Sequence, residues 1–509
     1  MGKSVFIAEK PSVAQEFAKA LHADFKRRDG FLESEQYIVT WCVGHLVTMS
    51  YPDKYDERLK RWSFDTLPFL PKEFKYEVIP AVEKQFQIVK GLLTREDVKT
   101  IYVCTDSGRE GEYIYRLVER MAGVKDKEEK RVWIDSQTEE EIQRGIREAK
   151  PMSAYENLGK SGIMRTIEDY AMGINFSRVM SVKYGGLLNN AAGTRSYTAI
   201  AVGRVMTCVL GMVVIREREI RNFRETPFYR VVGNFTDAHV QGEWKAVEGS
   251  GYFASPLLYK ENGFREKKDA LALIDRVQGH PAIVESIEKN ISRKRAPLLF
   301  NLAELQAECA KRFKISPDET LQVAQDLYER KLTTYPRTDA RVLSTPVAKE
   351  IHKNISRLRG YEPTSDFVEQ ILDRKLYGNI AGTQYTDDSK VTDHYAIIPT
   401  GQLTELGKLN ALQKSVFDLI VRRFLSVFYP AAEYQNVKMT AVVDVGEKKE
   451  RFYASARVLK TPGYLEIAGV PKKEEEDTDP KELLHLADQL KKGDEISVDG
   501  YEVKEGKTS

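Results

Sequence analysis

The segment from Leu332 to Asp339 places a phenol, a guanidinium and a carboxylate close together, at Tyr335, Arg337 and Asp339. Tyrosine is a poor nucleophile at its free pKa of about 10, so it needs a positive neighbour or a metal ion to attack as phenolate. Arg337 carries a permanent positive charge that suits this task. Pro336 predicts an extended loop that holds the phenol outward. The set suits attack on a phosphodiester, although a Tyr-Pro turn followed by a helix-capping Thr or Asp accounts for the same residues.

A charged pair, Glu9 and Lys10, follows a predicted buried strand over residues 4–8. The next ten residues carry apolar side chains at helical spacing, with Ser12 as the expected N-cap, so the pair lies in a strand-to-helix turn. Sites of α/β sheets lie at this carboxyl edge of the strands. A charged pair in such a turn is also common on a solvated surface, so a catalytic interpretation requires a partner.

A second apolar strand is predicted over residues 100–104 and leads to Asp106 and Glu110, which flank glycine at the start of another helix. With Glu9 from a neighbouring strand, these two carboxylates predict a hard-oxygen site of the kind that Mg²⁺ prefers. The alternative is structural, because Asp106 is also a suitable helix cap and Glu110 a favourable residue for the first helical turn. This segment alone does not choose between the two interpretations.

Together, in this order and at these separations, the three segments resemble the type IA DNA topoisomerases, most closely the topoisomerase III branch of bacteria and mobile elements. The family's first-strand glutamate and lysine match Glu9 and Lys10, its acidic metal motif matches Asp106 and Glu110, and its active-site tyrosine and arginine match Tyr335 and Arg337. The segment that ends at residue 400 resembles the family's histidine segment and places the family histidine on His394. The resemblance covers nearly the whole chain.

Some positions depart from the family pattern. Gly108 stands where many relatives carry a third acidic residue, which leaves the number of bound metal ions open. Met206 and Cys208 replace the usual glutamine and proline after the Gly-Arg-Val motif, and Tyr395 stands where many relatives have a second histidine. Relatives also normally continue beyond the segment that this chain ends with, so the resemblance predicts an incomplete gate-base domain.

The resemblance implies a toroidal, multidomain α/β plus α plus β architecture. The expected domains are a Toprim domain over 1–150, a helical gate-base domain over 151–222, a β arch over 223–296 and 401–505, and a helical domain carrying the tyrosine over 297–400. The active site is then expected to be split, because Tyr335 reaches Glu9 and Asp106 only across an interface.

The resemblance also implies a mechanism without ATP, in which Tyr335 forms a transient 5′-phosphotyrosine in single-stranded DNA before strand passage and religation. The expected outcome is relaxation of negative supercoils or decatenation. Glu9 is the candidate general acid for the departing 3′-oxygen, and Lys10 and Arg337 are expected to stabilise the phosphoryl charge. Mg²⁺ is expected at Glu9, Asp106 and Glu110. His394 is expected to contact a phosphate or the surroundings of Tyr335, or to be a structural histidine.

Two other functions remain open at this point. A Toprim domain also occurs in nucleases, so the N-terminal motif alone permits metal-dependent hydrolysis without a covalent intermediate. A truncated, non-catalytic DNA-binding remnant is the other alternative, motivated by the expected loss of C-terminal helices. Covalent attachment through Tyr335 distinguishes a topoisomerase from both.

The composition fits a large protein with more than one core. The 509 residues are 42% hydrophobic with a formal net charge of +2, so nucleic-acid binding is expected to depend on local charge rather than on the total. No apolar run approaches the length of about 20 residues of a membrane span, and no signal peptide is recognised, so a cytoplasmic location is expected. The four cysteines include no CxxC pair. The expected partners are DNA and a helicase or single-strand-binding protein, with the protein itself a monomer.

Overall fold

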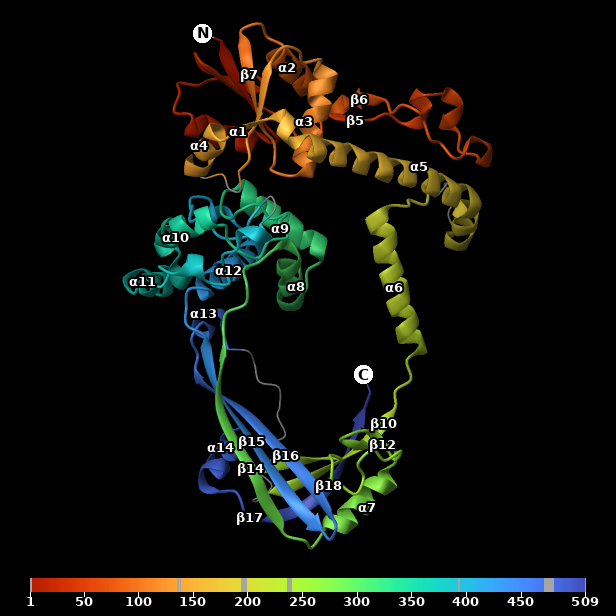
Figure 1. The fold of residues 1–509 in the computed structure, drawn as a ribbon, viewed down its shortest axis with the longest axis vertical. Helices are drawn as coiled ribbons and strands as arrows, with labels where there is room; N and C mark the ends of the chain where they lie inside the picture. Colours follow the sequence, from red (N-terminus) through yellow and green to blue (C-terminus); the bar gives the residue numbers. More distant parts are fainter. Residues whose placement is uncertain are drawn as a thin grey trace.

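The chain forms a ring of distinct domains (Figure 1). The computed structural model describes residues 2–134, 137, 139–193, 199–235, 240–391, 394–470 and 480–508. The N-terminal α/β domain lies at the top of the view, with a helical domain directly below it and a β arch at the bottom. Helices α5 and α6 close the ring on the other side. This arrangement confirms the predicted toroidal combination of an α/β domain, helices and a β arch.

The N-terminal domain is a mixed sheet with parallel central strands and antiparallel edges, covered by helices on both faces. Its elements are β1 (Lys3–Ala8), α1 (Pro11–Ala20), β2 (Lys26–Arg28), β3 (Phe31–Glu33), β4 (Tyr37–Trp41), β5 (Val47–Met49), β6 (Tyr76–Val78), α2 (Glu83–Leu93), β7 (Val98–Cys104), α3 (Arg109–Ala122), β8 (Glu128–Arg131), α4 (Glu139–Arg147) and β9 (Lys150–Pro151). The strand order is β2-β3-β4-β1-β7-β8-β9. The central strand β1 runs parallel to both β4 and β7.

Side chains of the central strand alternate between two apolar cores, as a strand with both faces covered requires. Val5 and Ile7 pack with α2 and α3, whereas Phe6 and Ala8 pack with α1 and α4. The helix after β1 begins earlier than the sequence predicted, because Lys10 rather than Ser12 is the N-cap. Pro11 explains the shift, since proline is favoured at the first helical position, where no N–H is needed.

Helices α5 (Glu156–Ala192) and α6 (Arg204–Asn222) occupy the range predicted to be helical before the arch. An extension of the N-terminal domain between β5 and β6 lies along α5 (Figure 1). Asn175 of α5 fastens it by accepting from Phe69 N at 2.6 Å and donating to Phe69 O at 2.9 Å. No residue of α6 is buried. Within the described ranges, no helix combines the length and apolar character needed to cross a membrane.

The helical domain has one continuous apolar core. Its helices are α8 (Leu302–Phe313), α9 (Pro317–Glu329), α10 (Thr345–Arg357), α11 (Ser365–Asp373), α12 (Ala411–Ser426) and α13 (Leu465–Ala468). The core includes Val416, Phe417 and Phe424 of α12 together with Leu327 of α9. The structure therefore extends this domain beyond the predicted limit at residue 400, because the apolar face of α12 packs against the helices rather than the arch.

The arch is a long antiparallel sheet with α7 and α14 packed on it. Its elements are β10 (Pro227–Phe235), β11 (Val240–Lys245), β12 (Leu258–Lys260), β13 (Gly263–Phe264), α7 (Lys267–Val277), β14 (Ala282–Lys294), β15 (Ala432–Val445), β16 (Lys448–Thr461), α14 (Pro480–Gln489), β17 (Glu495–Ile496) and β18 (Val498–Lys507). Strand β14 pairs with β15, so strands that precede and follow the helical domain in sequence meet in space. The two strands thus carry the helical domain above the arch (Figure 1).

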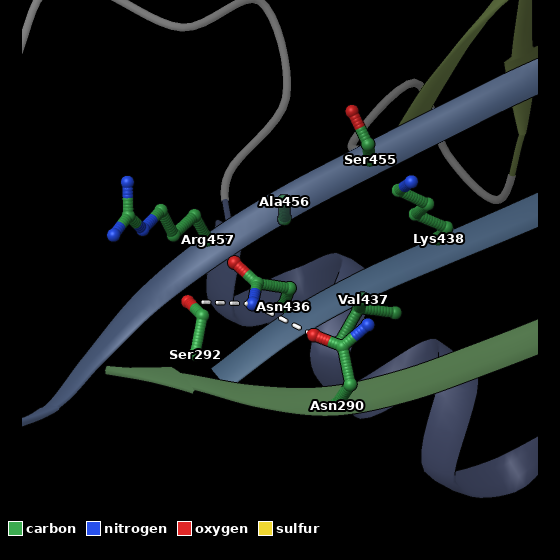
Figure 2. A pocket seen from close by; sticks show the side chains of 8 residues that line it. All are labelled: Asn290, Ser292, Asn436, Val437, Lys438, Ser455, Ala456 and Arg457. Carbon is green, nitrogen blue, oxygen red and sulfur yellow. Dashed lines mark hydrogen bonds between the residues drawn. The ribbon is translucent and has the colours of Figure 1, made fainter. Parts of the chain in front are cut away.

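The end of the arch sheet nearest the helical domain has a polar hollow on one face (Figure 2). There Asn436 Nδ2 donates to Asn290 Oδ1 and to Ser292 Oγ, each at 2.8 Å. Lys438 and Arg457 lie on the same hollow. The alternate residues of β15 and β16, such as Met439 and Ala454, belong to the arch core together with α14, so this part of the sheet has one apolar and one polar face.

Candidate active site

The two N-terminal site segments emerge side by side at one edge of the sheet. Strands β1 and β7 are adjacent and parallel, with Ala8 opposite Cys104, so the turns that follow them carry Glu9 and Asp106 to the same place. The backbone N–H of Asp106 donates to Glu9 Oε2 at 3.4 Å. Lys10 Nζ lies 3.2 Å from Asp106 Oδ2 and 3.5 Å from Glu9 Oε1. The sequence prediction that neighbouring strands bring these residues together is confirmed.

The three charges perturb one another strongly. Burial raises the pKa of Glu9, and the nearby Asp106 carboxylate adds to this effect. Burial also opposes ionisation of Asp106, but the nearby His394 imidazole and the charge of Lys10 outweigh it and lower the pKa of Asp106 to about 2. Burial disfavours the charged form of Lys10, yet Asp106 and Glu9 raise the pKa of this ammonium overall. The cluster therefore contains a fixed anion, a fixed cation and one carboxyl that holds its proton to higher pH.

A buried arginine that the sequence analysis did not single out fixes the loop bearing Asp106. Arg131 at the end of β8 is fully buried. Its guanidinium donates to the carbonyl oxygens of Thr105 and Asp106, each at 2.7 Å, and its Nε to Glu112 Oε2 at 3.1 Å. Because the guanidinium group carries several N–H donors in a rigid plane, one arginine side chain can bind several backbone carbonyl groups at once. In the sequence, the position of this arginine within a predicted core strand was the feature that could have indicated its structural role.

Asp106 does not cap the helix that follows it, so this alternative interpretation of the sequence is wrong. Helix α3 starts at Arg109 with Gly108 as its N-cap, and no side chain caps it. The Asp106 carboxylate instead points to Lys10 and His394. This loop is also closely packed, because a Cβ at Gly111 would lie 2.1 Å from Asp106 O. The glycine is needed here for close approach of the helix to the loop.

Tyr335 lies on a loop of the helical domain that pairs with a second loop. Thr334 N donates to Ile398 O at 2.9 Å, and a β-bridge joins the residues on either side of this contact. Farther along, Thr338 Oγ1 donates to His394 O at 2.7 Å. These contacts place the tyrosine and histidine segments next to each other, and no helix begins directly after Tyr335.

The two halves of the site meet at Tyr335. Lys10 Nζ lies 4.5 Å from the centre of the Tyr335 ring, which is a cation–π contact between the two domains. The imidazole of His394 lies 4.5 Å from the same ring, and its Nε2 is 3.6 Å from Asp106 Oδ2. Tyr328 of α9 packs edge-on against Tyr335 at 5.3 Å. Glu9, Lys10, Asp106, Tyr335 and His394 thus form one cluster built by two domains.

Two predicted site residues lie apart from this cluster. Arg337 is exposed and does not line the cavity that contains Tyr335. The side chain of Glu110 is 68% exposed, and its Oε1 lies 2.8 Å from His45 Nε2. Hydrogen bonding from His45 lowers the pKa of Glu110. In this structure Glu110 is therefore held by a histidine and not by the Glu9–Asp106 pair.

The donor set fits a Mg²⁺ ion with few protein ligands. Among the residues that the structure describes, no three acidic, histidine or cysteine side chains converge on one point. Glu9 and Asp106 nevertheless lie together, joined through Lys10. Mg²⁺ keeps several waters and commonly takes one or two carboxylates plus substrate phosphates, so this pair meets its minimum requirement.

A cavity of about 690 Å³ opens between the two domains at this cluster. Its lining includes Lys10, Asp106, Tyr335 and His394 from the cluster, and continues over α1 and α9. A space of this size between domains is typical of a ligand or substrate site. A phosphodiester in this cavity would face the Tyr335 phenol, the Lys10 ammonium and the Asp106 carboxylate, with Glu9 directly behind Lys10.

Comparison with known protein families agrees with this geometry. A family model described as DNA topoisomerase matches residues 153–509, more than half of the chain. This chain belongs to the type IA DNA topoisomerase family. A model of the Toprim domain matches residues 4–136. This part of the chain supplies Glu9, Lys10 and Asp106 to the site.

Curated relatives place the chain near the topoisomerase III branch. It is 36% identical over 501 residues to DNA topoisomerase 3 of Bacillus subtilis (strain 168), which covers 98% of this chain and 64% of the relative. It is 35% identical over 509 residues to DNA topoisomerase 3 of Bacillus licheniformis, covering 100% of this chain and 65% of the relative. The chain thus spans slightly less than two thirds of the length of these relatives.

A solved structure shares the fold. Full-length topoisomerase I from Thermotoga maritima aligns with a TM-score of 0.59 at 19% sequence identity, covering 99% of this chain and 72% of that structure. The likeness extends over the α/β domain, the helices and the arch, because almost the entire chain is included.

Proposed function

We propose that this protein is a DNA topoisomerase that cuts and rejoins one DNA strand through Tyr335. The single observation that carries the proposal is the meeting of Tyr335 with Lys10, Asp106 and His394 across the domain interface. A phenol beside a fixed ammonium is suited to nucleophilic attack on a phosphodiester. The N-terminal domain alone would suit hydrolysis, so the tyrosine supports the transesterase over the nuclease.

In the cleavage step, Tyr335 Oη attacks the phosphorus of single-stranded DNA and loses its proton to solvent. The bond from phosphorus to the 3′-oxygen of the preceding nucleotide breaks as the bond to Tyr335 forms. Glu9 donates a proton to the departing 3′-oxygen, a role that fits a carboxyl whose pKa is raised by burial. Religation runs the same bonds in reverse, so one phosphodiester replaces another and no ATP is required.

The cationic groups stabilise negative charge on the DNA phosphate. Lys10, held between Glu9 and Asp106, stabilises the negative charge that develops on the phosphoryl oxygens. His394 positions the Tyr335 ring and contacts the phosphate. Arg337 lies at the exposed end of the loop, and its proposed role in phosphate binding requires the DNA strand to reach it. Glu9 and Asp106 would hold a Mg²⁺ ion, which would supply positive charge for orienting the strand during religation.

The ring gives a second DNA strand a passage through the break in the first. Opening the interface at Tyr335 separates the two DNA ends while Tyr335 holds one of them, and a second strand enters the ring before closure. The proposed outcome is relaxation of negative supercoils or decatenation. We place the protein on DNA in the cytoplasm as a monomer, with a helicase or a single-strand-binding protein as the proposed partner.

The test is a trapping experiment with a 3′-end-labelled single-stranded oligonucleotide, quenched with detergent. Wild-type protein is expected to retain label, and Tyr335→Phe to retain none, a loss of at least about 10⁴-fold in covalent product. Free fragments from both proteins would instead identify a Toprim nuclease. Uncut oligonucleotide from the wild type, with binding intact, would identify a DNA-binding remnant. Relaxation of supercoiled plasmid then tests strand passage.

A further inference from the structure

A turn at the edge of the N-terminal sheet brings a histidine to the second acidic motif. His45 lies between β4 and β5, and β4 runs parallel to β1 on the side opposite β7. The backbone of this turn is bound to the turn that carries Glu9, because Gly44 N donates to Glu9 O at 3.3 Å. A third strand end therefore joins the two that carry Glu9 and Asp106. No step of the proposed mechanism uses His45.

The imidazole of His45 binds the carboxylate of Glu110. His45 Nε2 lies 2.8 Å from Glu110 Oε1. Because an ionised carboxylate only accepts hydrogen bonds, the imidazole donates through Nε2. Its ring lies 6.0 Å from that of Tyr113, which is one helical turn farther along α3. Tyr113 is buried, so it gives the imidazole a fixed surface to pack against.

The backbone of Glu110 lies close to the Asp106 loop, although its carboxylate is bound elsewhere. The first turn of α3 packs so closely on this loop that a Cβ at Gly111 would lie 2.1 Å from Asp106 O. The Glu110 side chain is 68% exposed, so surrounding side chains restrict its rotamer little. The direction of the side chain, set by His45, thus separates this carboxylate from the pair of Glu9 and Asp106.

We propose that His45 keeps Glu110 out of the metal site, so that Glu9 and Asp106 bind the ion without a third carboxylate. The inference deepens the proposed function and rests on the Mg²⁺ site assigned there. A third carboxylate would add one negative charge and fill a coordination position. With two carboxylates, more positions stay open for water and for phosphate oxygens of the DNA. His45 is thus a positioning residue that sets how tightly the site binds a divalent cation.

The test compares variants of the whole protein at one fixed pH and without DNA. His45→Ala releases Glu110, Glu110→Gln removes its charge, and a double variant combines the two changes. His45→Gln keeps an N–H donor near the position of Nε2, so it should still hold Glu110. His22→Ala is the matched control, because His22 Nε2 lies 2.8 Å from Glu139 Oε1 in an exposed pair of the same domain.

The measurement is the binding of Mn²⁺ to metal-free protein by electron paramagnetic resonance, because Mn²⁺ shares the preference of Mg²⁺ for carboxylate oxygens. His45→Ala is expected to bind Mn²⁺ at least about threefold more tightly than the wild type. Glu110→Gln should stay within about twofold of the wild type, and the double variant should match Glu110→Gln. His45→Gln and His22→Ala should both match the wild type.

Results that overturn the inference differ from those that overturn the proposed function. If His45→Ala binds Mn²⁺ as the wild type does, or if its gain persists in the double variant, His45 does not act by restraining Glu110. Weaker binding by His45→Ala would mean that the histidine supports the existing site, and would also overturn the inference.

The metal site and the cleavage chemistry can fail separately. If the wild type binds no Mn²⁺, the proposed metal site fails and the inference fails with it, whatever the trapping experiment gives. If Mn²⁺ binding follows the expected pattern but no strand is trapped on Tyr335, the inference is supported and the proposed cleavage chemistry alone is overturned.

Discussion

The two halves of the active site are held in different ways. In the N-terminal half, the Asp106 loop is fastened by the fully buried Arg131, and Lys10 is bound to both carboxylates. In the helical half, Tyr335 lies on a loop held mainly by backbone pairing and by the rings of Tyr328 and His394. The first half is set by charge inside one domain, and the second by loop packing in another.

The contacts between the halves at the site involve charged and aromatic side chains. Each domain has its own buried apolar clusters, and those of the described residues contain no member shared across the interface. The contacts found at the site are the cation–π contact of Lys10 with Tyr335 and the approach of His394 to Asp106. Separating the domains therefore exposes little core, because each half keeps its own supports. Such an interface would suit the opening and closing that the proposed function requires.

Among substitutions that test this difference between the halves, Lys10→Met is expected to lower DNA cleavage the most. The change leaves Glu9 and Asp106 uncompensated and removes the contact to Tyr335, so cleavage is expected to fall by about 10³-fold. The fall in cleavage is measured as the amount of protein covalently linked to a single-stranded oligonucleotide. Lys84→Met is the matched control, because Lys84 forms only an exposed pair with Asp29. Near-wild-type cleavage by Lys10→Met would mean that the N-terminal half is not organised around this ammonium.

A smaller effect is expected from Glu9→Gln. A general acid works while protonated, so the wild-type cleavage rate should fall as pH rises through the folded-state pKa of Glu9, which burial places above its usual 4.5. Glu9→Gln should lower the rate by about 10²-fold and remove this part of the pH profile.

The stability of the folded protein provides a second measurement of the same group. Because the folded state binds the Glu9 proton more tightly than the unfolded state, Glu9 is expected to make stability decline as pH rises from its unfolded pKa through its folded pKa. Melting temperatures of Glu9→Gln should decline less over that range. An unchanged pH profile for cleavage would rule out Glu9 as the proton donor.

The smallest expected effect is on the Mg²⁺ requirement, and it should differ between Asp106 and Glu110. Asp106→Asn is expected to raise the Mg²⁺ concentration needed for religation by about tenfold, because Asp106 adjoins Glu9 in the cluster. Glu110→Gln is expected to change it by less than about twofold, because Glu110 is exposed and held by His45. Titration of Mn²⁺ by electron paramagnetic resonance measures binding independently of activity. Equal effects of both variants would restore the three-carboxylate site that the sequence predicted.

Residue types and spacing determined much about this protein. The apolar strands before Glu9 and Asp106 predict adjacent strands, which the structure has in parallel, and the Tyr335 segment predicts the nucleophile, because such patterns reflect local burial and local chemistry. The expected strand, helix and strand order of the arch and helical domain is also present. The predicted N-cap of the first helix, Ser12, lies two residues after the observed N-cap, Lys10, because Pro11 occupies the first helical position.

Only the tertiary structure decided how these parts are used. The choice for Asp106 between a helix cap and a member of the charged cluster depended on Lys10 and His394, which reach it from other parts of the chain. The buried role of Arg131, the pairing of Glu110 with His45 and the membership of α12 in the helical core likewise depend on contacts between distant segments. Sequence periodicity reports which face of an element is buried, but the partners of a charged side chain are fixed only when the domains are assembled.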